Sequence, residues 1–398
     1  MPRPKIAAIV TEYSPNSHAQ HIVDRFLWGY SWRGHHHLPP VDLVSIYVDQ
    51  ADEGDLSRDR ATRFPAMRIY PSIAEALTCG GEDLAVDGVV LIGEHGRYPL
   101  NEKGQRLYPR YEFFMQIVEV FRRSGRSAPL FSDKHLSWKW EWAKEMVDVS
   151  KELGFAFIAG SSTPLNRRFP PVEIPRDAKV EEIVCVATGD ADSYDIHALE
   201  AMQSMVERRR GGETGVVAMQ ALRGDAALEC LARDSWESGG LDRELFEACL
   251  CRSHMLMPPR EGFNHILPRL EDIPRLLDGS ALAYRFEYAD GMKATMILVE
   301  GLVHDRTFAA RLKGQPEPIS LLMSIDSFNP RNFFTPQVNA MEQMFLTGRP
   351  TFPIERTLLT TGLTAAGVES LWLGQKRIET PHLAIRYQPT EESTFWRN

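Results

Sequence analysis

Short apolar runs alternate with longer amphipathic stretches along the first half of the chain. The short runs are apolar at consecutive positions, which is typical of parallel strands that are covered on both faces. In the longer stretches apolar residues recur every three or four positions, which indicates helices. We predict strands at 5–10, 41–48, 87–92, 128–131 and 155–159, and helices at 18–32, 72–77, 111–123 and 140–153. This alternation favours a Rossmann-type domain with a doubly wound parallel sheet.

The second half of the chain has a different pattern. Residues 166–175 are proline-rich and basic, which is typical of a domain boundary. Beyond them we predict strands at 180–187, 216–221, 281–288, 293–299 and 307–312, and helices at 193–209, 334–346 and within 355–373. The sequence therefore predicts an α/β domain over residues 1–165 and an α+β domain with a large open sheet over residues 166–398.

Composition narrows the choice of partners. The 398 residues are enough for two domains. A formal net charge of −9 repels polyanions, so we expect no nucleic-acid partner. The five cysteines form no CxxC pair, which indicates reduced thiols and a cytoplasmic protein. No apolar run reaches membrane-spanning length, so we expect no membrane partner and a small-molecule substrate instead.

Polar residues follow the predicted strands at the edge where a Rossmann-type sheet binds its ligands. Lys134 follows the strand at 128–131, and Glu94 and His95 follow the strand at 87–92 between two glycines. A long polar loop at 97–110 comes next, and long structured loops at such an edge are often functional. We therefore predict that these three side chains face one cleft and are catalytic, and that the loop contributes Tyr98 to substrate binding. The alternative is an ordinary surface loop.

Three segments share a further pattern. In the first, Asp133-Lys134-His135 stands between a strand and a helix, and in the second, His197 lies near the start of a helix. The third holds a late helix and a turn that ends in proline. The segments are 128–159, 194–200 and 337–353. Together they resemble the Gfo/Idh/MocA family of oxidoreductases, in which the first segment carries a Glu-Lys-Pro motif.

The resemblance implies an activity. Family members transfer a hydride between NAD and a sugar, a cyclitol or a related hydroxy acid. By analogy, Lys134 orients the substrate beside the nicotinamide, and His197 acts as the general acid/base that exchanges the hydroxyl proton. Members commonly pair through the open face of the second sheet, so the strands within 281–312 predict a homodimer or a larger homo-oligomer.

The cofactor loop departs from the family pattern. Family members usually have glycines after the first strand, which let backbone N–H groups approach a pyrophosphate. Residues 12–18 contain no glycine, so we expect Glu12, Asn16 and Ser17 to line the cofactor with their side chains. Asp49 ends the second strand, where an acidic residue binds the adenosine ribose in this fold.

An alternative chemistry uses the same cleft. His135 stands where the family has proline and adds an acid/base group or a metal ligand. Together with His95, His197 and Glu200 it would suit Mn, Fe or Zn, and the metal would drive a lyase, isomerase or hydrolase reaction. Glu200, on the helical face of His197, is also expected to bind substrate, and the pair Arg167 and Arg168 is expected to bind a substrate carboxylate or phosphate.

Overall fold

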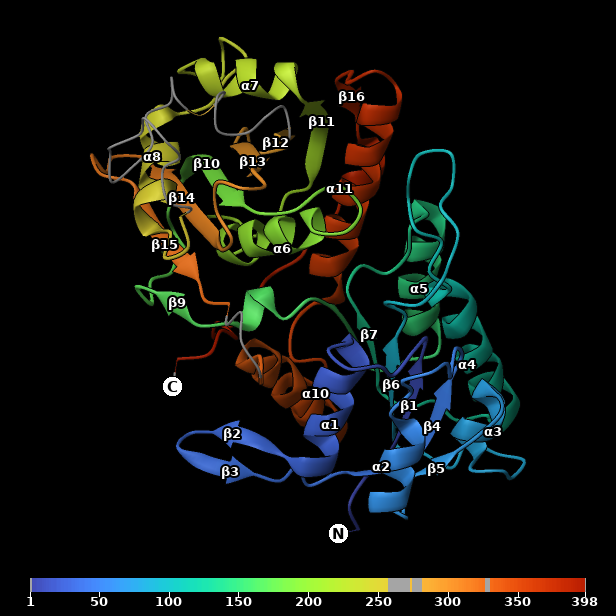
Figure 1. Ribbon diagram of the computed structural model, residues 1–398. Helices are drawn as coiled ribbons and strands as arrows, with labels where there is room; N and C mark the ends of the chain where they lie inside the picture. Colours follow the sequence, from blue (N-terminus) through green and yellow to red (C-terminus); the bar gives the residue numbers. More distant parts are fainter. Residues whose placement is uncertain (1, 257–272, 274–280, 326–329, 398) are drawn as a thin grey trace.

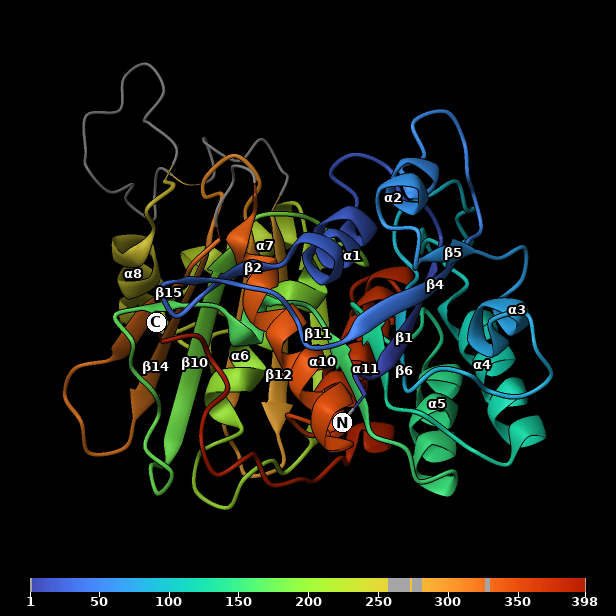
Figure 2. The same ribbon diagram turned by 90° about the horizontal axis from the view of Figure 1, so that it is seen from below.

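The computed structural model describes residues 2–256, 273, 281–325 and 330–397. Two β-sheets lie side by side, and each belongs to one half of the molecule (Figure 1). The parallel sheet of the first half and the larger sheet of the second are separated by helices (Figures 1 and 2). No helix among the described residues is long and apolar enough to cross a bilayer.

The first sheet has six parallel strands in the order β5-β4-β1-β6-β7-β8. This order, with β1 in the middle and crossovers on both sides, confirms the predicted Rossmann-type domain. The central strands β1 and β6 are apolar and almost wholly buried, which explains why their sequences show no alternation. The strands are β1 (Lys5–Val10), β4 (Asp42–Val48), β5 (Arg68–Ile69), β6 (Gly88–Ile92), β7 (Leu130–Asp133) and β8 (Phe157–Gly160).

Helices cover both faces of this sheet. On one face pack α3 (Ile73–Thr78), α4 (Arg110–Ser124) and α5 (Trp140–Glu152). On the other pack α1 (His18–Trp28) and α10 (Thr335–Thr347). Because α10 comes from the second half of the chain, the core of the first sheet is not built from residues 1–165 alone. The short helix α2 (Ser57–Arg63) and the hairpin of β2 (Tyr30–Trp32) and β3 (His35–His37) complete this part.

The helix that we predict over 18–32 ends earlier, at Trp28. Gly29 ends it with a φ of 80°, a conformation that favours glycine. A Cβ at this position would lie 2.3 Å from the carbonyl oxygen of His37. The close approach of the two backbones therefore requires glycine here, and the chain continues into the β2–β3 hairpin.

The second sheet has eight strands in the order β16-β11-β12-β13-β10-β14-β15-β9. It is mixed, because β10 and β13 are parallel while the other neighbours are antiparallel. The strands are β9 (Arg168–Phe169), β10 (Val180–Ala187), β11 (Val216–Arg223), β12 (Leu282–Tyr288), β13 (Lys293–Leu298), β14 (Arg306–Leu312), β15 (Ile319–Met323) and β16 (Ile378–Glu379). The predicted α+β domain with a large sheet is thereby confirmed.

Both faces of the second sheet are covered within the chain. One face packs against α6 (Asp195–Val206) and α11 (Ile354–Trp372), and the other packs against α7 (Asp225–Ala232) and α8 (Arg243–Arg252). The open face that we expected to pair with a second copy is therefore covered by α7 and α8. A homo-oligomer stays a prediction. Short 3-10 turns lie at Thr163–Leu165, Asn332–Phe334 and Pro381–Leu383.

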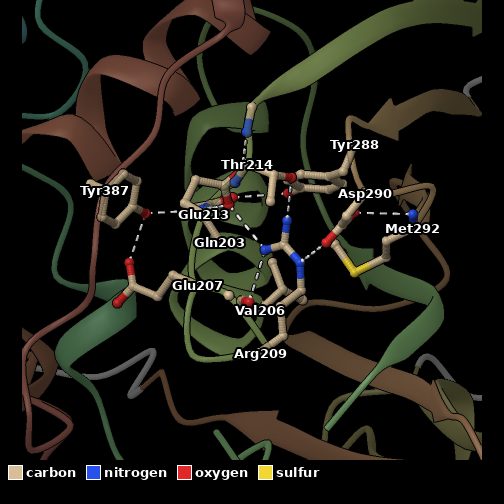
Figure 3. Close-up of polar contacts among 12 residues, drawn as sticks. Gln203, Val206, Glu207, Arg209, Glu213, Thr214, Tyr288, Asp290, Met292 and Tyr387 are labelled. Atoms are coloured by element: carbon tan, nitrogen blue, oxygen red, sulfur yellow. Dashed lines mark hydrogen bonds and ion pairs between the residues drawn. The ribbon is translucent and has the colours of Figure 1, made fainter. Parts of the chain in front are cut away.

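A buried polar network fixes the C-terminal end of α6 (Figure 3). Arg209 lies between Glu213, at 3.1 Å, and Asp290, at 2.7 Å. Gln203 donates to the carboxylate of Glu213 at 2.6 Å and to the hydroxyl of Tyr387 at 2.9 Å. The network therefore connects α6 to the turn between β12 and β13 and to the C-terminal segment.

The same network reaches α11 through a buried ion pair. The hydroxyl of Tyr387 donates to Glu207 at 2.8 Å, and the guanidinium of Arg356 donates to both oxygens of this carboxylate, at 2.9 and 2.5 Å. Both side chains of the pair are 3% exposed. Since α11 also packs against α5 and β8, this pair connects the second domain to the helix that contacts both domains.

Replacing Arg356 with methionine tests this connection. The change leaves the buried carboxylate of Glu207 without its cation, and breaking such a pair costs about 3–5 kcal/mol. We expect the free energy of unfolding, measured by urea titration, to fall by this amount. The matched control is Arg349→Met, because Arg349 is exposed. Equal stabilities of the two variants would show that the pair does not hold the domains together.

Candidate functional site

A cavity of about 490 Å³ lies between the two domains. It is at the carboxyl ends of β1, β6 and β7, where the fold places ligands. The structure brings together four of the predicted residues here: Glu94, His95 and Lys134 from the first domain, and His197 from the second. Other charged and polar residues that line the cavity include His18, Asp133, Ser161, Thr188, Tyr194, His304, Arg306 and Arg331.

A buried cluster of three charges forms one wall of this cavity. Lys134 Nζ lies 2.8 Å from Glu94 Oε1, and the guanidinium of Arg110 contacts the other oxygen of the same carboxylate. Burial raises the pKa of Glu94, but Lys134 and Arg110 outweigh it and hold that pKa well below its ordinary value. Glu94 therefore stays charged, which fits an electrostatic partner of Lys134 better than the predicted catalytic acid or base.

Sequence reasoning did not identify Arg110, the first residue of α4, as a member of the site. Its side chain is completely buried and passes directly over Gly93, where a Cβ would lie 2.5 Å from Arg110 Cγ. The glycine before Glu94 is therefore the signal that could have indicated a close approach at this point.

Lys134 connects the two domains. Its ammonium group donates a hydrogen bond to the carbonyl oxygen of Ser193 at 3.0 Å, in addition to its ion pair with Glu94. An ammonium group has three N–H donors, so one remains for a ligand in the cavity. The backbone of Lys134 has a φ of 60°, which lies in the left-handed region that residues other than glycine rarely adopt. Strained backbone of this kind is concentrated at functional sites.

His197 faces Lys134 from the start of α6. Its Nδ1 has no hydrogen-bond partner among the described residues. Burial, and then the charges of Arg306 and Lys134, lower its pKa well below the ordinary value. The imidazole is therefore neutral near pH 7 and has a nitrogen that accepts a proton.

One histidine of the cavity that was not among the predicted site residues forms an ion pair there. His18, the first residue of α1, places Nδ1 2.6 Å from Oδ2 of Asp133. Its ring makes edge contacts with His95, at 5.0 Å, and with Phe334, at 5.1 Å between centroids. His18 thus reaches across the end of β6, the strand that lies between β1 and β7. The contact joins side chains 115 residues apart, so no local spacing indicates it.

Four of the predicted residues that lie outside this cavity contact other parts of the protein instead. His135 is buried and its Nε2 lies 3.2 Å from Arg110, and Glu200 accepts a hydrogen bond from the backbone N–H of Ser161 at 2.7 Å. Arg167 stacks on the ring of Trp396, and Arg168 stacks on the ring of Phe395. The last two were expected to bind substrate, and their positions do not support that role. Glu200 and His135 face the protein interior, so neither catalysis by His135 nor substrate binding by Glu200 is supported.

These positions also correct the metal hypothesis. The expected ligands were two histidines and a carboxylate from among His95, His135, His197 and Glu200. In the part of the chain that the structure describes, no group of three histidine, cysteine, aspartate or glutamate side chains is arranged to hold a metal ion. The alternative with Mn, Fe or Zn is therefore not supported.

A second cavity, of about 620 Å³, lies next to the first and shares His95 with it. Glu12, Arg97, Tyr98 and Arg106 line it as well. The loop at 97–108 thus forms part of a ligand-sized space, as its polar sequence predicts. Glu12 and Tyr98 both face this space.

The residues expected at the cofactor's adenosine end are engaged within the protein. Asp49 accepts hydrogen bonds from the hydroxyls of Tyr47, at 2.9 Å, and Tyr98, at 2.6 Å. In the turn before α1, Ser17 accepts from the backbone N–H of Gln20 at 3.2 Å, and the N–H of Asn16 donates to the side chain of Gln20 at 2.6 Å. The N–H group of Asn16 in the glycine-free turn and that of Gln20 in the first turn of α1 are therefore already satisfied.

Comparisons with known proteins relate this fold to dehydrogenases. No family model matches the chain, and no curated protein sequence matches it. Among solved structures, GenD2 from gentamicin A biosynthesis, in complex with NAD, is 14% identical with a TM-score of 0.55, covering 95% of this chain and 97% of its own. Myo-inositol dehydrogenase from Lactobacillus casei, in complex with NAD(H) and myo-inositol, is 11% identical with a TM-score of 0.56, covering 98% and 99%. Myo-inositol 2-dehydrogenase from Lactobacillus plantarum is 13% identical with a TM-score of 0.53, covering 94% and 99%. The chain therefore has the two-domain fold of these dehydrogenases over nearly its whole length.

The two adjacent cavities lie at the edge of the sheet where a doubly wound fold binds its ligands. The first holds the unused N–H of Lys134, and the second presents Arg97 and Arg106 to an anion. The lining of this second space contains these two arginines and one carboxylate, that of Glu12. Arg97 pairs with Asp52 at the surface, and an exposed pair of this kind is weak enough to exchange for a phosphate.

Replacing Glu200 with glutamine tests the contact between α6 and the end of β8. Burial raises the pKa of Glu200 to about 7, although the N–H of Ser161 lowers it in part. Because the folded pKa lies above the unfolded value, the folded protein favours the protonated carboxyl group. Its contribution to stability is fully present below the unfolded pKa of about 4.3 and is lost as the pH rises through about 7.

We expect the melting temperature of the wild type to fall relative to that of Glu200→Gln between about pH 5 and pH 8, measured by scanning calorimetry. Glutamine resembles the protonated carboxyl group and does not ionise. Glu119→Gln, on an exposed part of α4, is the control and should follow the wild type. A constant difference between wild type and Glu200→Gln at all pH values would contradict the assignment.

Proposed function

We propose that the chain is an NAD-dependent oxidoreductase that oxidises a hydroxyl group of a sugar, a cyclitol or a related hydroxy acid. The observation that carries this proposal is the arrangement of Lys134 and His197 in one cavity. Lys134 has an unused N–H donor, and His197 has a neutral imidazole. The similarity in fold to dehydrogenases solved with NAD or NAD(H) supports it.

Each residue has a role that follows from its surroundings. Lys134 donates its remaining hydrogen bond to the oxygen of the substrate hydroxyl and stabilises the negative charge that develops there. Glu94 and the carbonyl of Ser193 hold the ammonium group in place. His197 accepts the hydroxyl proton, because its neutral ring has an acceptor nitrogen near pH 7. The bound dinucleotide supplies the hydride acceptor.

The chain's own residues would hold this cofactor in an unusual way. In the family, backbone N–H groups of a glycine-rich turn bind the cofactor's phosphates. Here Arg97 and Arg106 would bind the phosphates instead, because the side chains of the glycine-free turn at 12–18 would crowd the approach of a phosphate to its backbone. Asp49 would bind the adenosine ribose once the hydroxyl of Tyr98 releases one of its oxygens. Both steps involve exposed side-chain contacts, which exchange at low cost.

One observation favours a second candidate function. Both oxygens of Asp49 are engaged, and the pair of His18 and Asp133 places an oriented histidine in the cavity. A histidine whose other nitrogen is held by a carboxylate is suited to act as a general base. The second candidate is therefore proton abstraction from a hydroxylated substrate, with elimination or isomerisation and no hydride transfer.

Binding and turnover measurements distinguish the two functions. We expect calorimetry to show that the purified protein binds NAD or NADP. In a panel of sugars, cyclitols and hydroxy acids, we expect at least one substrate whose oxidation reduces the bound dinucleotide. For His197→Gln we expect kcat to fall about 10²–10⁴-fold, the usual contribution of a positioned acid/base, with the affinity for NAD unchanged. His36→Gln, at an exposed position, is the control. Absence of binding to both dinucleotides would contradict hydride transfer and leave the second candidate.

A further inference from the structure

Arg306 is a buried cation of the candidate active site that forms no ion pair with any residue the structure describes. It is the first residue of β14, lines the cavity beside His197, and is only 7% exposed. Over the described ranges 2–256, 273, 281–325 and 330–397, its guanidinium makes no hydrogen bond or ion pair, and its Nε is buried without a partner. Burial lowers its pKa to about 10, which still leaves it charged near neutral pH.

The neighbouring acidic residue, Asp305, raises the pKa of Arg306 in part, but it forms no ion pair with Arg306 among the described contacts. Asp305 accepts hydrogen bonds from the hydroxyl of Ser253, at 2.9 Å, and from the backbone N–H of His254, at 2.7 Å. Its carboxylate is thus engaged with the segment that follows α8. The acidic residues that line the cavity are also paired, since Glu94 contacts Lys134 and Asp133 contacts His18.

Another arginine of the same strand shows what a structural role looks like. Arg311 contacts Asp242 and Glu244, each at 2.7 Å. It lies near the other end of β14 and is an ordinary paired cation. Arg306, in contrast, is more deeply buried and faces a cavity. A buried charge without a partner is costly in free energy, so its presence at this position indicates a ligand of opposite charge.

We propose that Arg306 is an anion-binding residue of this cavity, and that the substrate carries a carboxylate or phosphate group beside its hydroxyl. The proposal rests on the proposed function, and it narrows the substrate class from neutral polyols to acidic or phosphorylated ones. Arg331, from the segment before α10, lines the same cavity and adds a second positive charge. Lys134 then donates a hydrogen bond to the reacting hydroxyl, while Arg306 binds the anionic group of the substrate.

Calorimetric titration with three matched ligands tests this proposal. Glucose is neutral, glucuronate has a carboxylate, and glucose 6-phosphate has a phosphate. We expect the wild type to bind at least one of the anions about tenfold or more tightly than glucose, and the preferred anion identifies the group. Arg306→Gln should remove this preference, Arg306→Lys should retain part of it, and Arg349→Gln, at an exposed position, should behave as the wild type.

Thermal unfolding without ligand separates ligand binding from a structural role. Because Arg306 forms no ion pair in the described part of the chain, Arg306→Gln should be at least as stable as the wild type. A clear fall in melting temperature together with unchanged ligand affinities would overturn the proposal. Equal affinity of the wild type for glucose and both anions would also overturn it, whatever the variants do.

The result is independent of the test of hydride transfer. Arg306-dependent anion binding in a protein that binds no dinucleotide would support the anion site and contradict the oxidoreductase function. Dinucleotide-dependent oxidation of neutral sugars that is unchanged in Arg306→Gln would support the function and contradict the anion site.

Discussion

The rest of the site depends on one interaction, the buried contact of the Glu94 carboxylate with Arg110 and Lys134. A cation at the first residue of a helix opposes the helix dipole, so Arg110 needs this carboxylate in order to begin α4 in a buried position. The same carboxylate holds Lys134 at the end of β7 with its ammonium group in the cavity. Removal of the charge would leave two buried cations without a partner.

Residues of the second domain hold the ends of β7 and β8 in place. Lys134 donates to the carbonyl of Ser193, and Glu200 of α6 accepts from the N–H of Ser161 just after β8. On the opposite side, Gln337 of α10 donates to the carbonyl of Gly160 at 2.8 Å. Three polar contacts thus connect the ends of β7 and β8 to the second half of the chain. His197 and Arg306 face the first domain because these contacts fix the relative position of the two sheets.

The sequence predicted the elements better than it predicted the site. Apolar runs identified β1 and β10 with their observed bounds, because burial on both faces leaves a clear local signal. The strand-end position of Lys134 and the family resemblance around His197 predicted that both face one cleft, and both line the cavity. The position of His135 next to Lys134 in the sequence was misleading, because the side chain of His135 packs against Arg110 and not in the cavity beside Lys134. His18, Arg110 and Arg306 were missed because their roles come from contacts between distant segments, which no local spacing records.

A crystal structure of the protein grown with NAD(H) tests the central claim, that the space between the two domains is a dinucleotide-dependent active site. We predict density for a dinucleotide that runs from the cavity at Lys134 to the one lined by Arg97 and Arg106, with the hydroxyl of Tyr98 displaced from Asp49. A structure at saturating NAD(H) with both cavities free of cofactor, and Tyr98 still bonded to Asp49, would contradict the account.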